Sequence, residues 1–117
     1  MKDLEHQVQV AICQYLDVRN VMYFAIPNGG KRNITTAAKL KKEGVKAGVP
    51  DLCIIHEGQA FFLEVKKPAT LGKGKGRLSS AQKEMIPRLE EAGAEVKIVY
   101  SVADVIEACI DWHINVL

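Results

Sequence analysis

Two carboxylates and a lysine stand at the ends of two apolar runs in the stretch "GVPDLCIIHEGQAFFLEVKKP", residues 48–68. Asp51 precedes the first run, and Glu64 and Lys66 end the second. Charged side chains are rarely buried unless they are paired or bind a metal. Carboxylate oxygens suit a hard divalent cation, which can polarise a phosphate, and a lysine can stabilise the charge that develops on it. These residue types therefore point to metal-assisted cleavage of a phosphate ester.

A tight β-hairpin is predicted for the two runs, because only "EG" separates them. With the turn at Glu57–Gly58, Asp51 is expected opposite Glu64, with Cβ atoms roughly 5 Å apart. Glu64 and Lys66 are two residues apart, so they point to the same face of the strand. A bulge would shift this register by one residue. Two carboxylates that close repel one another unless a cation lies between them, so the register predicts a cation site.

A salt bridge between Glu64 and Lys66 at the end of a strand is the alternative explanation of this pattern. It accounts for an isolated E-x-K on a strand without any chemistry. The position of Asp51 in register with Glu64 makes it the weaker explanation.

The elements that position these residues follow from hydrophobic periodicity. Apolar spacing predicts a helix over residues 4–16 with Asp3 as its N-cap, and "VMYFAI" predicts a strand over residues 21–26. A short helix is predicted to end at Gly44. Both hairpin runs are almost continuously apolar, so both faces of that part of the sheet are expected to be covered.

The second half of the chain predicts a helix over residues 79–93, a strand over 95–100 and a helix over 101–114 capped by Ser101. Pro87 is expected to kink the first of these helices or to mark an early boundary. With Ser80 as the cap, Lys83 occupies the position of the capping-box glutamate, so no box is expected. The resulting order, α-β-(α)-β-β-α-β-α, predicts an α/β fold: a small mixed β-sheet flanked by helices, with the last strand parallel to its neighbour.

Length and composition are those of one soluble domain over residues 1–117. No apolar run approaches the ~20 residues of a membrane span, and the N-terminus is too polar for a secretory signal. The three cysteines, Cys13, Cys53 and Cys109, form no C-x-x-C pair and lie in apolar surroundings. They are interpreted as buried thiols in a reducing compartment, so we expect a cytoplasmic protein. Trp112 is expected in the core or at an interface.

Positive charge is concentrated in residues 31–77, which hold 11 of the 16 Lys and Arg residues but only 4 of the 14 acids. Such a segment suggests a polyanionic partner, most readily nucleic acid, although a solubilising surface is the alternative. Two flexible, glycine-containing loops carry candidate phosphate contacts, and ordinary turns are the alternative there. The candidates are Asn28, Lys31 and Arg32 in the first loop, and Lys73, Lys75 and Arg77 in the second.

"GVPD", followed about a dozen residues later by "LEVKKP", resembles the PD-(D/E)xK nuclease superfamily. Within it the chain is similar to the VRR-NUC family, the virus-type replication-repair nucleases. "IPNGGKR", "KKEGVKAGVPDL", "LSSAQ" and a late G-x-x-V strand followed by "S" extend the resemblance over essentially the whole chain. The resemblance implies a restriction-endonuclease-like core and a metal-dependent DNA endonuclease.

Site roles follow from the resemblance residue by residue. It implies that Asp51, Glu64 and the carbonyl of Val65 bind Mg²⁺, for which Mn²⁺ can substitute, and that Lys66 is the catalytic lysine. Gln82 matches a polar residue that assists the site from the following helix; by itself it would be taken for a surface glutamine. Glu5 matches an acid that contacts the metal through water or binds a second one; its alternative role is to complement the helix dipole.

Small stand-alone members of this family, known from phages and bacteria, imply a homodimer that cuts branched DNA such as Holliday (four-way) junctions in repair and recombination. Exposed apolar residues of the first or last helix are candidates for the dimer surface, and a replication or helicase partner stays open. Tyr100 stands where the family often has an arginine, which bears on a phosphate or structural role there. Two other classes remain: a non-cleaving DNA-binding module on a nuclease fold, and a protein-interaction subunit that uses the basic face. The complete set of Asp51, Glu64 and Lys66 favours the nuclease.

Overall fold

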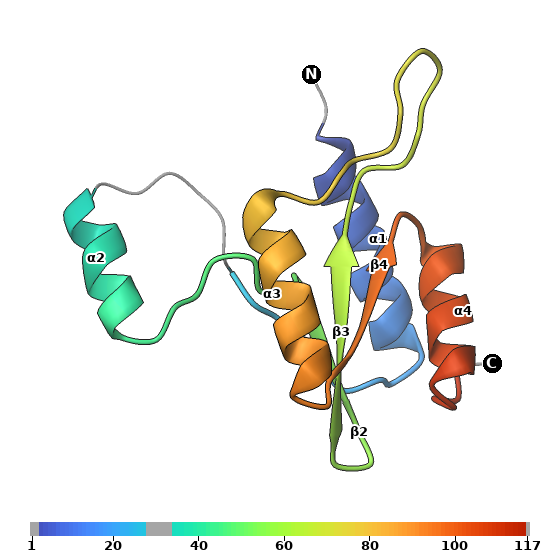
Figure 1. Ribbon diagram of the computed structural model, residues 1–117. Helices are drawn as coiled ribbons and strands as arrows, with labels where there is room; N and C mark the ends of the chain where they lie inside the picture. Colours follow the sequence, from blue (N-terminus) through green and yellow to red (C-terminus); the bar gives the residue numbers. More distant parts are fainter. Residues whose placement is uncertain (1–2, 28–33, 117) are drawn as a thin grey trace.

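A mixed four-stranded sheet forms the centre of the protein in a computed structural model, which describes residues 3–27 and 34–116 (Figure 1). The spatial order of the strands is β1-β2-β3-β4. In the described part of the chain the elements are α1 Leu4–Val18, β1 Tyr23–Ala25, α2 Ile34–Lys42, β2 Leu52–His56, β3 Gln59–Val65, α3 Ser80–Glu91, β4 Glu95–Val99 and α4 Val102–Asp111. This order of helices and strands confirms the one predicted from the sequence.

Strand directions follow from the connections. β1 pairs with β2, and β2 with β3, in antiparallel fashion, while β3 and β4 are parallel. Two parallel strands cannot be joined by a tight turn, and α3 provides the crossover between them. The mixed sheet with a parallel last strand is therefore confirmed.

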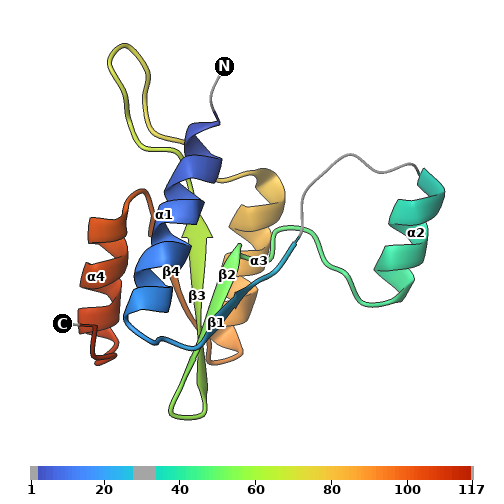
Figure 2. The same ribbon diagram turned by 180° about the vertical axis from the view of Figure 1, so that it is seen from behind.

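Helices cover both faces of the sheet (Figures 1 and 2). α1 and α4 pack on one face, and α3 lies on the other, mainly against β4. The core fills the α1/α4 side, and the ring centroids of Phe61 and Trp112 lie 4.8 Å apart within it. Trp112 is thus a core residue. The buried apolar side chains that α1, α4 and the sheet contribute include Ile12, Leu16, Leu52, Ile54, Leu63, Val65, Val99, Val105 and Cys109.

The burial of the three cysteines agrees in part with the expectation. Cys53 and Cys109 are buried, Cys13 is partly buried, and all three are free thiols. Burial raises the pKa of each thiol, which disfavours the reactive thiolate. No helix within residues 3–27 and 34–116 is long and apolar enough to cross a membrane.

α2 stands away from the rest of the molecule, joined through the extended segment that leads to β2 (Figures 1 and 2). The helix carries Lys39, Lys41 and Lys42 in its last turn, where cations complement the helix dipole. Gly44 follows with a φ of 101°, as expected of a glycine that ends a helix.

The start of α3 differs from the prediction. Ser79, not Ser80, is the N-cap, and the hydroxyl of Ser79 accepts a hydrogen bond from the backbone N–H of Gln82. This choice of cap places Gln82 at the third helical position, where its side chain completes a capping box. The expectation that no box forms was wrong because it counted from the neighbouring serine.

α3 also continues through Pro87 to Glu91, so Pro87 does not mark an early boundary. A proline inside a helix removes one hydrogen bond and costs about 3 kcal/mol. Packing of α3 against β4, with Met85 buried beneath the helix, favours the continuous helix at this position.

Candidate active site

The β2–β3 hairpin sets the positions of the two carboxylates. Glu57 and Gly58 form its turn with φ values of 49° and 80°, the two positive angles that a tight two-residue turn requires. The paired residues run from His56 opposite Gln59 to Leu52 opposite Leu63 without a bulge. This ladder, continued by one residue, places Asp51 opposite Glu64. The register derived from the sequence is therefore the register of the structure.

Glu64 is the buried charged residue of the described chain, with a relative exposure of 1%. Its Oε2 accepts a hydrogen bond of 3.0 Å from Gln82 Nε2 and lies 3.9 Å from Lys66 Nζ. Its Oε1 is buried, and no described residue forms a hydrogen bond to it. The ion pair with Lys66 exists, but it is long and reaches only one oxygen. A salt bridge alone therefore does not account for the burial of this carboxylate.

Asp51 is held by hydrogen bonds from the chain on either side of β2. Its Oδ2 accepts a 2.8 Å hydrogen bond from the backbone N–H of Val65, and its carbonyl accepts one of 2.8 Å from the N–H of Ile26. The first bond crosses from the end of β2 to the end of β3. It holds the Asp51 carboxylate beside the residue that follows Glu64.

Burial is the largest cause that raises the pKa of Glu64 to about 9; the adjacent carboxylate of Asp51 also raises it, and Lys66 lowers it. A carboxyl group with this pKa is neutral at pH 7 in the protein without a cation. Two ionised carboxylates so close, one of them out of water, would repel each other strongly. The pair is thus arranged to hold a positive charge, either a shared proton or a cation.

A hard divalent cation fits this donor set. Carboxylate oxygens from Asp51 and Glu64 and the main-chain carbonyl of Val65 are ligands of the kind that Mg²⁺ accepts, together with water and phosphate oxygens. The unpartnered buried Oε1 of Glu64 is the atom that such an ion would satisfy. Within the described ranges no group of three or more His, Cys, Asp or Glu side chains comes together. Protein side chains alone would therefore leave several coordination positions for water and substrate.

Glu5 lies in the first turn of α1 within electrostatic reach of the pair. The residue is exposed, and partial burial of its carboxyl raises the pKa. Lys66 lowers that pKa and Asp51 raises it, so Glu5 interacts electrostatically with both groups. The structure thus brings Glu5 near the pair, although no hydrogen bond joins it to Asp51 or Glu64.

Gln82 connects the helix cap to the carboxylate pair. Its Oε1 accepts a hydrogen bond of 2.8 Å from the N–H of Ser79, which leaves its Nε2 to donate to Glu64. Because one end of the amide must accept and the other must donate, the two bonds together fix its orientation. Gln82 is half-buried, so it is not the surface glutamine that its position alone suggested.

Gly48 was not singled out from the sequence, although it opens the "GVPD" motif. Its φ is 83°, and a Cβ there would lie 2.3 Å from the carbonyl oxygen of Ala81 in the first turn of α3. Only glycine allows this approach. Pro50, two residues on, is fully buried. These residues pack the segment before Asp51 against the turn that carries Gln82, and the glycine within the motif was the available signal.

The basic candidates fall into two groups. Asn28, Lys31 and Arg32 lie outside the described residues. Lys73, Lys75 and Arg77 lie between β3 and α3, in a projection that extends beyond the end of the sheet (Figures 1 and 2). Thr70 and Lys73 exchange two backbone hydrogen bonds of 2.9 Å, so the loop expected here is closed into a hairpin.

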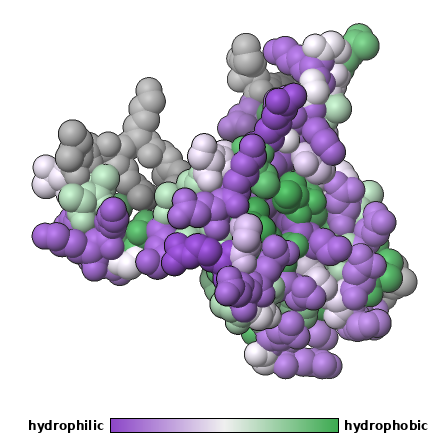
Figure 3. Space-filling model, in the orientation of Figure 1, coloured by the Kyte–Doolittle hydropathy of each residue, from purple (hydrophilic) through white to green (hydrophobic). Residues whose placement is uncertain are grey.

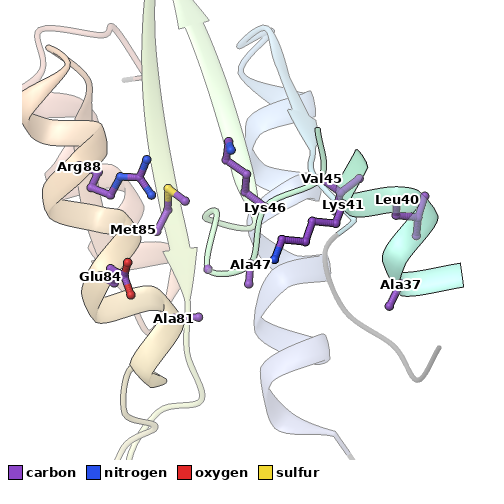
Figure 4. Close-up of a pocket in the computed structure, with 11 residues that line it drawn as sticks. Ala37, Leu40, Lys41, Val45, Lys46, Ala47, Ala81, Glu84, Met85 and Arg88 are labelled. Atoms are coloured by element: carbon purple, nitrogen blue, oxygen red, sulfur yellow. The ribbon is translucent and has the colours of Figure 1, made fainter. Parts of the chain in front are cut away.

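A separate hollow of about 680 Å³ lies between α3 and the segment that joins α2 to β2 (Figure 4). Lys41, Lys46 and Arg88 line it together with Glu84 and Met85. Asp51, Glu64 and Lys66 do not line it, so the carboxylate pair lies elsewhere.

Comparison with known proteins gives two matches. The sequence model of the VRR-NUC domain matches residues 3–103. A solved structure described as a VRR_NUC domain shares the fold, with a TM-score of 0.62 and 21% sequence identity over 94% of this chain and 97% of that chain. No curated protein matches the chain.

Proposed function

The chain belongs to the VRR-NUC family of PD-(D/E)xK-type nucleases, and on this premise we propose that it is a divalent-cation-dependent endonuclease acting on branched DNA as a homodimer. The observation that carries the catalytic part is the buried carboxylate Glu64, which has an unpartnered oxygen and lies opposite Asp51. A buried carboxylate beside a second carboxylate costs free energy in a folded chain unless a positive charge joins them. The cation that relieves this repulsion is the one that phosphodiester hydrolysis uses.

Mg²⁺ or Mn²⁺ held by Asp51, Glu64 and the Val65 carbonyl would supply positive charge to polarise the scissile phosphate and acidify a water. The chain's own groups do the remaining work. Asp51 is held by the Val65 N–H, and Glu64 by the Gln82 amide, so both carboxylates are oriented before substrate binds. Hydrolysis adds water across one P–O bond of the backbone.

Lys66 is the residue assigned to the charge that develops on the phosphate. Its ammonium lies 3.9 Å from Glu64 Oε2, and only 12% of its side chain is exposed. A cation in this partly dry position acts more strongly than one in water. Lys66 either donates to a phosphate oxygen or orients the attacking water. Glu5, near both groups, would contact the cation through water.

Two surfaces support the proposals that the substrate is branched DNA and that the protein is a dimer. The basic hairpin after β3 carries Lys73, Lys75 and Arg77 beyond the site, where they can neutralise phosphates. On the opposite side of the sheet from the core, Met22 lies across from Ile55. Phe24 follows on the same face, and the three are 62%, 38% and 46% exposed. We assign this strip, rather than the first or last helix, to the contact with a second copy.

The test uses a labelled four-way junction and a linear duplex, each with Mg²⁺, with Mn²⁺ and with EDTA. Wild-type protein is expected to cut the junction faster, only with the metals, and Glu64→Gln is expected to bind without cutting. Glu91→Gln, an exposed acid at the end of α3, serves as the matched control and should cut like wild type. Metal-independent binding without cutting by wild type would favour a non-cleaving DNA-binding module. The absence of any salt-sensitive binding would exclude both DNA functions.

Light scattering tests the dimer. A mass near twice 12.9 kDa at assay concentration is expected, and Phe24→Ser should shift the mass toward that of one chain.

In the cutting assay, equal rates on the junction and the linear duplex would leave a nuclease without structure selectivity.

A further inference from the structure

A hairpin over residues 67–76 projects from the end of β3, directly after Lys66 (Figures 1 and 2). Its arms are joined by the Thr70–Lys73 bonds and by a hydrogen bond of 2.9 Å from the Gly76 N–H to the Lys67 carbonyl. Lys67 Nζ also donates to the carbonyl of Gly74 at 2.6 Å. The turn passes through Gly72, whose φ of 80° suits a glycine. The projection is therefore a hydrogen-bonded β-hairpin with a defined turn at its tip.

Leu71 occupies that tip with a relative exposure of 104%, the highest among the large apolar side chains of the described residues. Figure 3 shows the apolar group at the outer end of the projection, apart from the rest of the apolar surface. A side chain so exposed contributes no packing to the folded chain. A single exposed leucine is common on proteins, so its meaning depends on what surrounds it.

The charged residues nearest to it in the sequence are all basic. Residues 65–83 contain no Asp or Glu but carry Lys66, Lys67, Lys73, Lys75, Arg77 and Lys83. An apolar tip between cations does not match an acidic protein surface as well as it matches DNA, which offers phosphates beside apolar base faces. Proteins that kink or open DNA use this combination, with an apolar side chain inserted between base steps.

The base of the hairpin is anchored to the sheet. Lys75 Nζ lies 4.8 Å from the centroid of the Tyr100 ring at the end of β4, a cation–π contact. The two arms are close at Gly76, where a Cβ would lie 3.3 Å from the Lys67 nitrogen. Tyr100 thus connects the hairpin to the end of β4.

We propose that this hairpin probes DNA for a branch or opened step, with Leu71 inserted against the exposed bases while the flanking lysines hold the phosphates. The proposal rests on the proposed function for its substrate, DNA, and adds the residue that selects the structure. From Lys66 to Leu71 the arm spans five residues, roughly 17 Å at ~3.3 Å per residue. That is the length of about five stacked bases at 3.4 Å each, so cuts should fall within about five nucleotides of the branch.

The experiment measures binding in EDTA, where no cutting occurs, with 2-aminopurine placed at the branch of a four-way junction. Wild-type protein is expected to increase the fluorescence by unstacking the base. Leu71→Ser should remove the increase and lower the preference for junction over linear duplex about tenfold, while affinity for linear duplex stays unchanged. Leu71→Met, which keeps an apolar tip, should retain both. Val18→Ser, at a 75% exposed apolar residue in α1, is the matched control.

The outcomes separate this inference from the nuclease itself. A full fluorescence increase with Leu71→Ser, or an equal loss of affinity for both DNAs, would overturn it. A change in oligomeric mass on Leu71→Ser would also overturn it, because the tip would then be a protein contact. A fluorescence increase without any Mg²⁺-dependent cutting would support the probe while removing the nuclease proposal. Mg²⁺-dependent cutting without a fluorescence increase would support the nuclease proposal and overturn the probe.

Discussion

Asp51 accepts a hydrogen bond from the backbone N–H of Val65, while the ladder places Asp51 opposite Glu64. The end of β3 therefore does two things: the main chain of Val65 holds the Asp51 carboxylate, and the side chain of Glu64 supplies the second carboxylate. Glu64 is buried, so the pair is held together at an electrostatic cost that a cation relieves. Four measurable consequences follow from this arrangement and from the packing around it.

Proton release should accompany cation binding. The pKa of Glu64 is raised from 4.5 to about 9, so the cation-free folded chain binds more protons than the unfolded chain between those values. Its contribution to stability is thus fully present below about 4.5 and is lost as pH rises toward about 9. Excess Mg²⁺ should reduce this loss, because the cation takes the place of the proton.

Calorimetry in buffers of different ionisation enthalpy measures the proton released on Mg²⁺ binding at pH 7. Glu64→Gln should release none and should show a flatter dependence of unfolding free energy on pH. Proton release that persists in Glu64→Gln would assign the proton to another group.

Gln82→Ala should affect both stability and cutting. It removes the capping-box side chain and the donor to Glu64 Oε2. The expected losses are about 1 kcal/mol in free energy of unfolding and 10- to 100-fold in cleavage rate, the range found for residues that orient ligands. Ser79→Ala is the control, because it weakens the same cap but keeps the Ser79 N–H that orients Gln82. Ser79→Ala should lose stability with a cleavage rate close to wild type. Equal losses of rate in both variants would mean that Gln82 acts only through the helix.

Gly48→Ala should destabilise the fold by more than about 2 kcal/mol, because strain at positive φ adds to a clash with the Ala81 carbonyl. Gly44→Ala provides a close comparison. Its φ is 101°, but nothing lies within 4 Å of an added Cβ, so only the backbone strain remains. Urea denaturation of both variants measures the difference. A smaller loss at Gly48 than at Gly44 would contradict the close approach to α3.

Insertion of one residue at the Glu57–Gly58 turn should abolish cleavage, since a one-residue slip turns a carboxylate to the opposite face of the sheet. A bulge that absorbs the extra residue would preserve activity, and backbone NMR of the β2–β3 ladder distinguishes the two cases. Wild-type activity combined with a slipped register would refute the geometry of the pair. Insertion of one residue at Gly93, in the exposed turn between α3 and β4, controls for a change in chain length.

Local spacing was enough to determine the pair of carboxylates. A two-residue turn fixes the register of a hairpin, and alternation of side chains along a strand fixes the faces, so Asp51, Glu64 and Lys66 could be placed by counting. The order of elements also followed from periodicity, and the parallel last strand from the helix before it.

Tertiary packing decided the rest, because it depends on which distant surfaces meet. The sequence offered two adjacent serines as the cap of α3, and in the structure Ser79 is the cap that accompanies the contact between Gln82 and Glu64. The glycine of the "GVPD" motif signalled an unusual backbone position, but nothing in the sequence indicated that Gly48 would meet Ala81. Likewise, the basic segment after β3 read as a flexible loop, and only the backbone pairing and the contact of Lys75 with Tyr100 reveal an anchored arm. Local periodicity does not encode any of these contacts, because each depends on how separate segments pack or on which hydrogen-bond partner a side chain finds.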